Sequence, residues 1–292
     1  MSWTGWILGS AFLLALYDLA KKASVRDNAV LPTLLCSTLF GCAAFATGCA
    51  LGGGLPAALR ADGRILAFAV VKSVIVATSW VFTFCALRTL PVTIATPIRA
   101  SAPALVFVIA FFLYGERPGA LQGLGMLTVF AGYWAFSWAG RHEGIDFFRS
   151  RAVWCAIGGA CCSALSSVWD KYIFQCAGAP VTVVQFWFQV GLVIVYATLL
   201  ALCRAFKVSQ HAFEWRWTIP LVGVLLAGAD WLYFTGLSFP GVPISVGSLL
   251  RRASVVITFV LGARFFHETN LRRKALAMAA IVIGVALLCL GK

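Results

Sequence analysis

The sequence predicts an all-α membrane protein with ten transmembrane helices, arranged as two repeats of five helices with inverted topology. The first observation is composition: 61% of the 292 residues are hydrophobic and only 11% are charged, whereas about 25% of a soluble domain is charged. The second is that apolar stretches long enough to cross a bilayer follow one another along the chain. The third is that the few charged residues inside these stretches recur at a constant offset.

The expected helices follow from the thickness of the bilayer. A hydrocarbon core of about 30 Å requires about 20 helical residues, and polar or Pro/Gly-containing segments divide the chain at that spacing. The N-terminal segment lacks a basic region and a cleavage site, so we expect it to be a retained helix. The expected spans are 3–22, 29–51, 65–87, 90–114, 119–139, 152–175, 181–203, 217–238, 242–266 and 272–290.

The two halves of the chain match each other at an offset of 152 residues. Random apolar segments match often at Ala, Val and Phe, but not at charged residues and prolines in one register. We therefore expect a first repeat over residues 1–140 and a second over 141–292. Because five is an odd number of spans, the second repeat enters the membrane from the opposite side. The offset pairs Pro91 with Pro243, Arg99 with Arg251, Glu116 with Glu268, and Asp18 with Asp170.

The net charge of +13 is explained by Lys and Arg at the helix ends, where they face lipid headgroups, so nucleic acid is not an expected partner. Fourteen of them fall on one side of the expected membrane topology and five on the side that carries both termini. The positive-inside rule then places both termini outside the cytoplasm.

The sequence predicts no enzyme, no cofactor and no metal site. Its ten cysteines are scattered through apolar stretches, and its three histidines do not lie near them at a metal-ligand spacing. Motifs of nucleophilic catalysis, zinc proteases and phosphate-binding loops are not found in the sequence.

The fourth and ninth spans each end in a hydrophobic step followed by Glu, FFLYGERPG at 111–119 and ARFFHETN at 263–270. With the ten spans and the inverted repeat, these segments resemble the drug/metabolite transporter superfamily, in particular its EamA-type members. The resemblance covers almost the whole chain and is specific to the superfamily, not to a substrate. It implies an alternating-access carrier with a central cavity and cytoplasmic termini, in conflict with the Lys/Arg count, so orientation stays open.

Charged side chains at bilayer depth are costly and are therefore candidates for function. Arg99 and Arg251 each lie eight residues after a proline, about 12 Å along a helix, and inverted symmetry places them across the central axis. Two guanidinium groups suit a carboxylate or phosphate. The alternative is structural, with each Arg bound to nearby carbonyls or an acid. Arg252 lies about 100° further around the helix, so the two arginines cannot point the same way and one of them is expected to meet a neighbouring acid.

Asp230 lies in the middle of the eighth span, in the segment AGADWLYFTG, and is flanked by Trp231 and Tyr233. Three interpretations are open: it holds a substrate amine with help from the aromatic rings, it carries a coupling proton, or it pairs with Arg251 or Arg252. Asp18 and Asp170 form a second symmetric pair, and each precedes a lysine closely. They are candidates for gating, or for ordinary helical ion pairs at a membrane interface.

Further candidates for the cavity wall are polar or aromatic residues inside the spans. Lys72 lines the cavity or extends toward the nearer membrane surface. Gln185 and Gln189 lie one turn apart and bind the substrate or join helices. The aromatic candidates are Trp80, Trp187 and Trp231.

These residues predict a secondary-active transporter of the inner cell membrane. Because Arg99, Arg251, Arg252 and Lys72 outnumber Asp230, we expect a zwitterionic or anionic metabolite, such as an amino acid or a phosphorylated or carboxylated compound. The alternative is a flippase for a lipid-linked phosphate or sugar. The expected partners are this solute, the bilayer and a coupling proton, and no oligomer is required.

Overall fold

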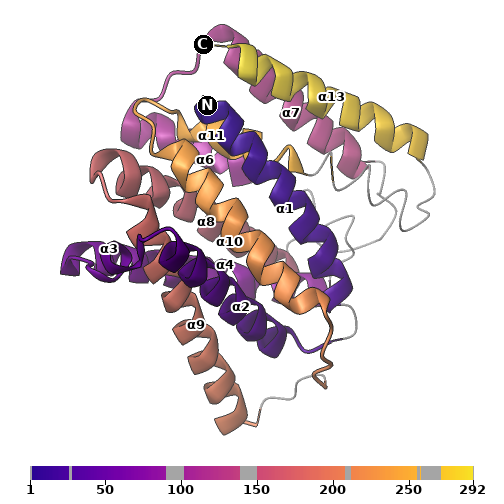
Figure 1. Ribbon diagram of the computed structural model, residues 1–292. Coiled ribbons are helices and arrows are strands. Elements are labelled where there is room, and N and C mark those ends of the chain that lie inside the picture. The colour runs from indigo at the N-terminus through magenta and orange to yellow at the C-terminus, as the bar shows by residue number, and fades with distance from the viewer. Residues whose placement is uncertain are drawn as a thin grey trace. The chain divides into compact units, whose positions relative to one another are not determined.

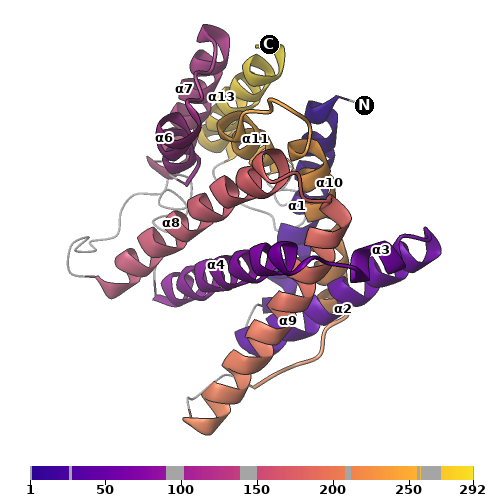
Figure 2. The ribbon, with the colours of Figure 1, turned by 90° about the vertical axis from the view of Figure 1, so that its left-hand side faces the viewer.

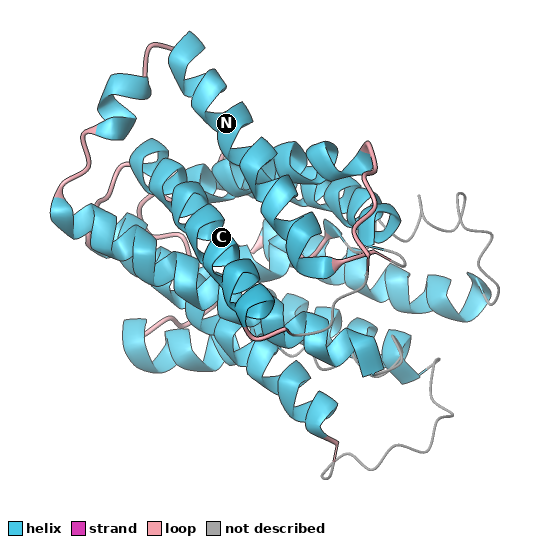
Figure 3. Ribbon diagram, turned by 90° about the horizontal axis from the view of Figure 1, so that it is seen from below, coloured by secondary structure: helices cyan, strands magenta, loops and turns pink. Residues whose placement is uncertain are grey.

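The computed structural model describes residues 2–25, 28–89, 102–138, 150–207, 212–254, 257 and 271–291. All regular elements in these ranges are helices (Figure 3). Six apolar helical segments are long enough to cross a membrane. They are α1 (Trp3–Val25), α2 (Val30–Leu51), α4 (Gly63–Thr89), α8 (Arg151–Lys171) continued by the π-helix η1 (Tyr172–Cys176), α9 (Val181–Ala205) and α10 (Thr218–Leu237).

The other four expected spans contain helices α6 (Ala102–Tyr114), α7 (Ala120–Trp138), α11 (Ile244–Arg251) and α13 (Leu271–Leu290). A short helix that was not expected, α3 (Leu55–Leu59), begins after the turn at Gly52–Gly54. The fold is therefore that of a multi-pass membrane protein built from helices. Alternation of apolar and polar segments was sufficient to place these helices along the chain.

The chain divides into two compact units, and each contains segments from both halves of the sequence. Unit 1 comprises Met1–Ala77 and Tyr172–Phe239. Unit 2 comprises Thr78–Lys171 and Pro240–Lys292. Helix α4 contributes its first part to unit 1 and its last part to unit 2.

In unit 1, α10 packs against α1 on one side and α2 on the other (Figure 1). Small residues allow a close approach to α2, since a Cβ atom on Gly41 would lie 2.7 Å from the carbonyl oxygen of Gly223. The contact with α1 includes a hydrogen bond of 2.6 Å from the Ser10 hydroxyl to the Ala229 carbonyl. Backbones that approach this closely gain dispersion energy that lipid tails do not supply.

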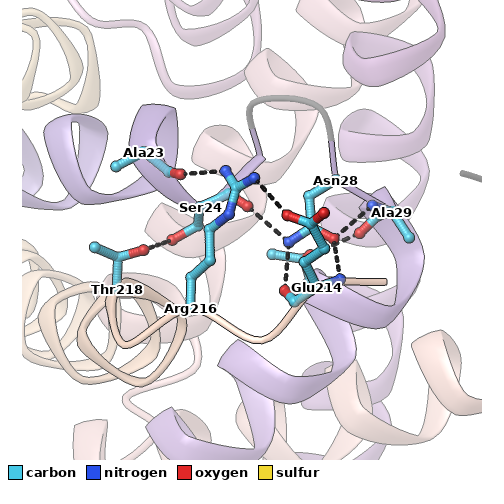
Figure 4. A network of polar contacts seen from close by, with 8 residues as sticks. Ala23, Ser24, Asn28, Ala29, Glu214, Arg216 and Thr218 are labelled. Carbon is cyan, nitrogen blue, oxygen red and sulfur yellow. Dashed lines mark hydrogen bonds and ion pairs between the residues drawn. The ribbon is translucent and has the colours of Figure 1, made fainter. Parts of the chain in front are cut away.

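Polar contacts join the end of α1 to the start of α10 (Figure 4). The Arg216 guanidinium donates to the Ala23 carbonyl at 2.8 Å. Asn28 and Glu214 exchange two hydrogen bonds, from the Asn28 amide to the Glu214 carbonyl at 2.7 Å and from the Glu214 N–H to Asn28 Oδ1 at 2.9 Å. These bonds satisfy backbone groups where the helices end.

Unit 1 also contains the crossing of α4 with α9 (Figure 2). The Ser73 hydroxyl donates to the Phe188 carbonyl at 3.0 Å. A Cβ atom on Gly191 would lie 2.9 Å from the Ser73 Cβ, so only glycine fits opposite this serine. The first part of α4 is thereby fixed on the middle of α9.

In unit 2, α7 and α13 lie side by side (Figures 1 and 2). A Cβ atom on Gly125 would lie 2.9 Å from the Gly284 carbonyl oxygen, and one on Gly284 would lie 2.8 Å from that of Gly125. The Gln122 amide also donates to the Gly291 carbonyl at 2.8 Å. Helix α6 packs against α8 and α11 in the same unit.

The expected span 242–266 differs from one continuous helix. Pro243 precedes α11 with φ −69° and ψ 124°, and the helix ends at Arg251. Arg252 and Ala253 then form a turn, in which the Arg252 N–H donates to the Leu249 carbonyl at 2.9 Å. This i→i+3 hydrogen bond, like that from the Ala253 N–H to the Leu250 carbonyl at 3.0 Å, is tighter than that of an α-helix. The arginine pair thus lies where the helix is interrupted.

Candidate functional site

Unit 1 contains a buried ammonium group, that of Lys72 on α4. The residue is 2% exposed. Its Nζ atom lies 4.4 Å from the ring centre of Phe234 on α10 and 4.8 Å from that of Phe188 on α9. Two aromatic faces stabilise a cation that has lost most of its water. Of the two interpretations of Lys72, this position agrees with a buried role and not with extension to the membrane surface.

A third phenyl ring completes this aromatic group. Phe174 lies 5.0 Å from Phe234, centre to centre, and belongs to η1. A π-helical turn shifts side chains from their α-helical positions and is frequent at functional sites. Gln175 of the same turn donates to the Leu237 carbonyl at 3.0 Å, which joins η1 to α10. The sequence indicated neither the π-helical turn nor the role of the three phenylalanines.

The buried face of α9 presents two amides and Phe188. Gln185 is fully buried and Gln189 is 2% exposed, and Phe188 and Gln189 follow Gln185 by three and four residues, so both neighbour it on one face of the helix. Gln185 Nε2 donates to the Ala227 carbonyl of α10 at 3.4 Å. Gln185 Oε1 is buried without a hydrogen-bond partner. This amide therefore retains an unused acceptor inside the unit.

Asp230 lies on the face of α10 that meets this part of α9. It follows Ala227 by three residues and precedes Phe234 by four, so the three positions form one stripe. Asp230 is 8% exposed and Tyr233 is 2% exposed. Trp231 is 38% exposed and packs edge-on against Trp6 of α1 with ring centres 6.0 Å apart. The carboxylate and Tyr233 are thus inside the unit, whereas Trp231 belongs to the contact between α1 and α10.

In unit 2, Glu116 forms a second buried polar cluster at the end of α6. Its Oε1 atom pairs with Lys171 Nζ at 2.5 Å and accepts the Ile244 N–H at 2.7 Å. Its Oε2 atom accepts the Ser245 hydroxyl at 2.6 Å and the Ser245 N–H at 3.2 Å. A carboxylate at a helix N-terminus satisfies backbone donors and interacts favourably with the helix dipole.

The Glu116 cluster extends to α8 through Tyr114. The Lys171 ammonium lies 4.8 Å from the centre of the Tyr114 ring. The Tyr114 hydroxyl donates to the Val168 carbonyl at 2.9 Å. Glu116 was singled out from the sequence as a landmark of the repeat and as part of the segment FFLYGERPG. Its spacing to Ser245 carried no indication of the contact, because the two residues lie far apart in the chain.

The remaining predicted site residues are distributed between the units. Asp18 and Trp187 in unit 1 are half-buried, and the Trp187 indole donates to the Ala58 carbonyl at 3.1 Å. In unit 2, Trp80, Arg251 and Arg252 are half-buried and Asp170 is 3% exposed. Arg99 lies outside the described residues. Among the predicted residues, Lys72, Gln185, Gln189, Asp230 and Tyr233 share the buried α4, α9 and α10 faces of unit 1.

Apolar helices that enclose a lysine, a carboxylate and two amides are typical of multi-pass membrane proteins with a polar site between their helices. Comparisons with known proteins gave similarities to one family and to a solved structure. Residues 1–138 match the EamA-like transporter family. A solved structure, described only as the crystal structure of a protein, matches 97% of this chain and 95% of its own with a TM-score of 0.72 and 23% identity. The comparison with curated proteins gave no match.

Residues 1–138, just under half of the chain, are therefore similar to the EamA-like transporter family. The solved structure, at its low identity, adds the fold alone.

Proposed function

We propose that the protein is a secondary-active transporter that moves a zwitterionic or anionic metabolite by alternating access. The observation that carries this proposal is Lys72, an ammonium group that is 2% exposed inside apolar helices. A buried cation is expensive to maintain. Ionisable side chains inside transmembrane helices commonly mark the path of a substrate, which supports a transported solute that carries negative charge.

The composition of the cluster supports the substrate class. Lys72 supplies one positive charge, Asp230 supplies one negative charge, and Gln185 and Gln189 supply neutral hydrogen-bonding groups. A solute that carries both a carboxylate and an amine complements this set. Because Lys72 and Gln185 are inaccessible to water in this structure, a solute reaches them only when helices separate, as they do in an alternating-access carrier.

The inverted repeat is part of the proposal, and contacts within each unit support it. At the offset of 152 residues, α4 corresponds to α10, and α1 corresponds to α8. A serine hydroxyl joins both pairs: Ser10 of α1 donates to Ala229 of α10 at 2.6 Å, and Ser79 of α4 donates to Gly159 of α8 at 2.8 Å. Equivalent helices thus pack in equivalent pairs, as an inverted repeat requires.

A second pair of contacts follows the same rule. Helix α2 corresponds to α9, and α10 corresponds to α4. Helix α2 meets α10 through Gly41 and Gly223, and α9 meets α4 through Gly191 and Ser73. Glu116, Lys171 and Ile244 also fall on one side of a ten-span topology, and their bonds are therefore compatible with it.

Counterflow in proteoliposomes tests the proposal. Vesicles preloaded with a mixture of unlabelled amino acids, carboxylates and sugar phosphates receive trace labelled members of each class, with no ATP present. A secondary transporter accumulates label transiently by exchange. Vesicles that show no exchange for any class, but translocate a fluorescent phospholipid or polyprenyl phosphate, would support the flippase instead.

A further inference from the structure

We propose that Gln185 is the specificity-determining residue for a primary ammonium group on the transported solute, with Oε1 accepting its N–H. This inference rests on the proposed function and names one end of the solute. Gln185 is fully buried, and its Oε1 atom has no hydrogen-bond partner. A buried acceptor without a donor destabilises the folded state. Its position is explained if a solute supplies the donor during transport.

The orientation of the amide is fixed by its other end. Nε2 points to the Ala227 carbonyl of α10, an acceptor that only the N–H₂ side of the amide can bond. The oxygen is therefore the atom that is presented to a ligand. A ligand group that binds it must be a hydrogen-bond donor.

The surroundings favour an ammonium donor over a hydroxyl or an amide. Asp230 follows Ala227 by three residues on the same stripe of α10, which places a carboxylate next to the turn that Gln185 contacts. Tyr233 and Phe234 add aromatic rings to this part of α10. An amide oxygen, a carboxylate and aromatic rings together are the groups that hold a primary ammonium.

Lys72 accounts for the other end of the solute. Its ammonium lies over Phe188, which follows Gln185 by three residues on α9, and over Phe234, which follows Asp230 by four on α10. The ammonium is thus displaced by about one helical turn from Gln185 along α9 and from Asp230 along α10. An α-amino acid spans such a gap, with its amine toward Gln185 and its carboxylate toward Lys72.

Matched solute pairs test the assignment, since each pair differs only in the amine. Proteoliposome uptake is measured for alanine against propionate, phenylalanine against 3-phenylpropionate, and glutamate against glutarate. The wild type should prefer the amine-bearing member of at least one pair. Gln185→Leu should reduce that preference tenfold or more, and Gln185→Met, which keeps the length of the side chain, should do the same.

Thermal unfolding without solute separates recognition from a structural role. Because each replacement removes an unsatisfied acceptor, the unfolding temperature of Gln185→Leu should equal or exceed that of the wild type. Gln122→Leu is the control, since that buried amide donates to Gly291 in unit 2. This substitution should change the uptake of both solutes of a pair equally. A lower unfolding temperature for both Gln185 variants would overturn the proposal.

The transport results separate this inference from the proposed function. Two results would overturn the role of Gln185 and leave the carrier intact. In the first, the Gln185 variants lose uptake of both solutes of a pair equally. In the second, the wild type takes up sugar phosphates but none of the amine-bearing solutes. Absence of uptake for every solute in the wild type would overturn both.

Discussion

Lys72 is a residue at which the requirements of stability and those of the proposed transport differ. Transfer of an isolated ammonium into an apolar interior costs many kcal/mol, and a cation–π contact returns about 2 kcal/mol when it is desolvated. The two rings at 4.4 and 4.8 Å offset part of this cost. A residue that serves packing alone would be better replaced by an apolar side chain of similar length.

Replacement of Lys72 by Met measures what the charge of Lys72 contributes to stability and to solute uptake. Met keeps most of the length of the side chain and an apolar contact with Phe188 and Phe234, while it removes the charge. The unfolding temperature in detergent should stay the same or rise by a few degrees, and uptake of anionic or zwitterionic solutes should fall at least tenfold.

Lys207→Met is the matched control, because Lys207 is exposed and lies beyond the end of α9 in the same unit. It should leave both properties unchanged. If Lys72→Met unfolded at a much lower temperature and retained its uptake, Lys72 would be a structural residue.

At the scale of elements, small residues and helix ends determine which helices pack together. Helix α2 approaches α10 so closely that a Cβ atom on Gly223 would overlap the Ser37 carbonyl group. Lipid surrounds both the separated and the associated helices with apolar atoms, so association depends on this fit. The glycine is needed for its size and not for its backbone conformation.

Gly223→Ala should therefore separate α2 from α10 and lower the unfolding temperature by about 5 °C, since overpacking costs about 1–3 kcal/mol. Gly123→Ala in α7 is the control, because a Cβ atom there meets nothing within 4 Å. It should leave the protein as stable or more stable, since alanine favours a helix. Equal effects of the two substitutions would argue against the close approach.

Glu116 stabilises the start of α11 by a different mechanism, in which one carboxylate joins three helices. Glu116→Gln should lose the ion pair with Lys171, and Glu116→Ala should also lose the bonds to Ile244 and Ser245. We expect the unfolding temperature to fall in that order.

A double-mutant cycle with Lys171→Met measures the ion pair itself. The coupling should be about 1–3 kcal/mol, as for a buried charge-assisted hydrogen bond. Additive effects of the two substitutions would show that Lys171 contributes nothing through Glu116.

At the scale of the molecule, hydropathy placed the helices along the chain because lipid imposes a minimum length on every span. The buried candidates Lys72 and Asp230 also followed from sequence, since a charge within an apolar span stands out. The aromatic rings around Lys72 did not follow from the sequence. A phenylalanine in an apolar span has the same pattern whether it faces lipid or, like Phe188, Phe234 and Phe174, belongs to a buried aromatic group. Their contacts depend on which helices meet.

The interruption of α11 was also beyond the sequence analysis. Two adjacent arginines indicated function but not a change in backbone hydrogen bonding. Glu116 was recognised through the repeat and through the segment FFLYGERPG. Its partners come from α8 and α11, which are separated from it by many residues.

Access to Gln189 from both membrane sides tests alternating access most directly. This side chain is 2% exposed on the buried face of α9. Gln189→Cys is introduced after the ten native cysteines are replaced by serine or alanine, and a membrane-impermeant maleimide is applied to right-side-out and inside-out vesicles. A carrier that opens in turn to each side should be labelled in both preparations. Labelling from one side only, or from neither, would contradict this mechanism.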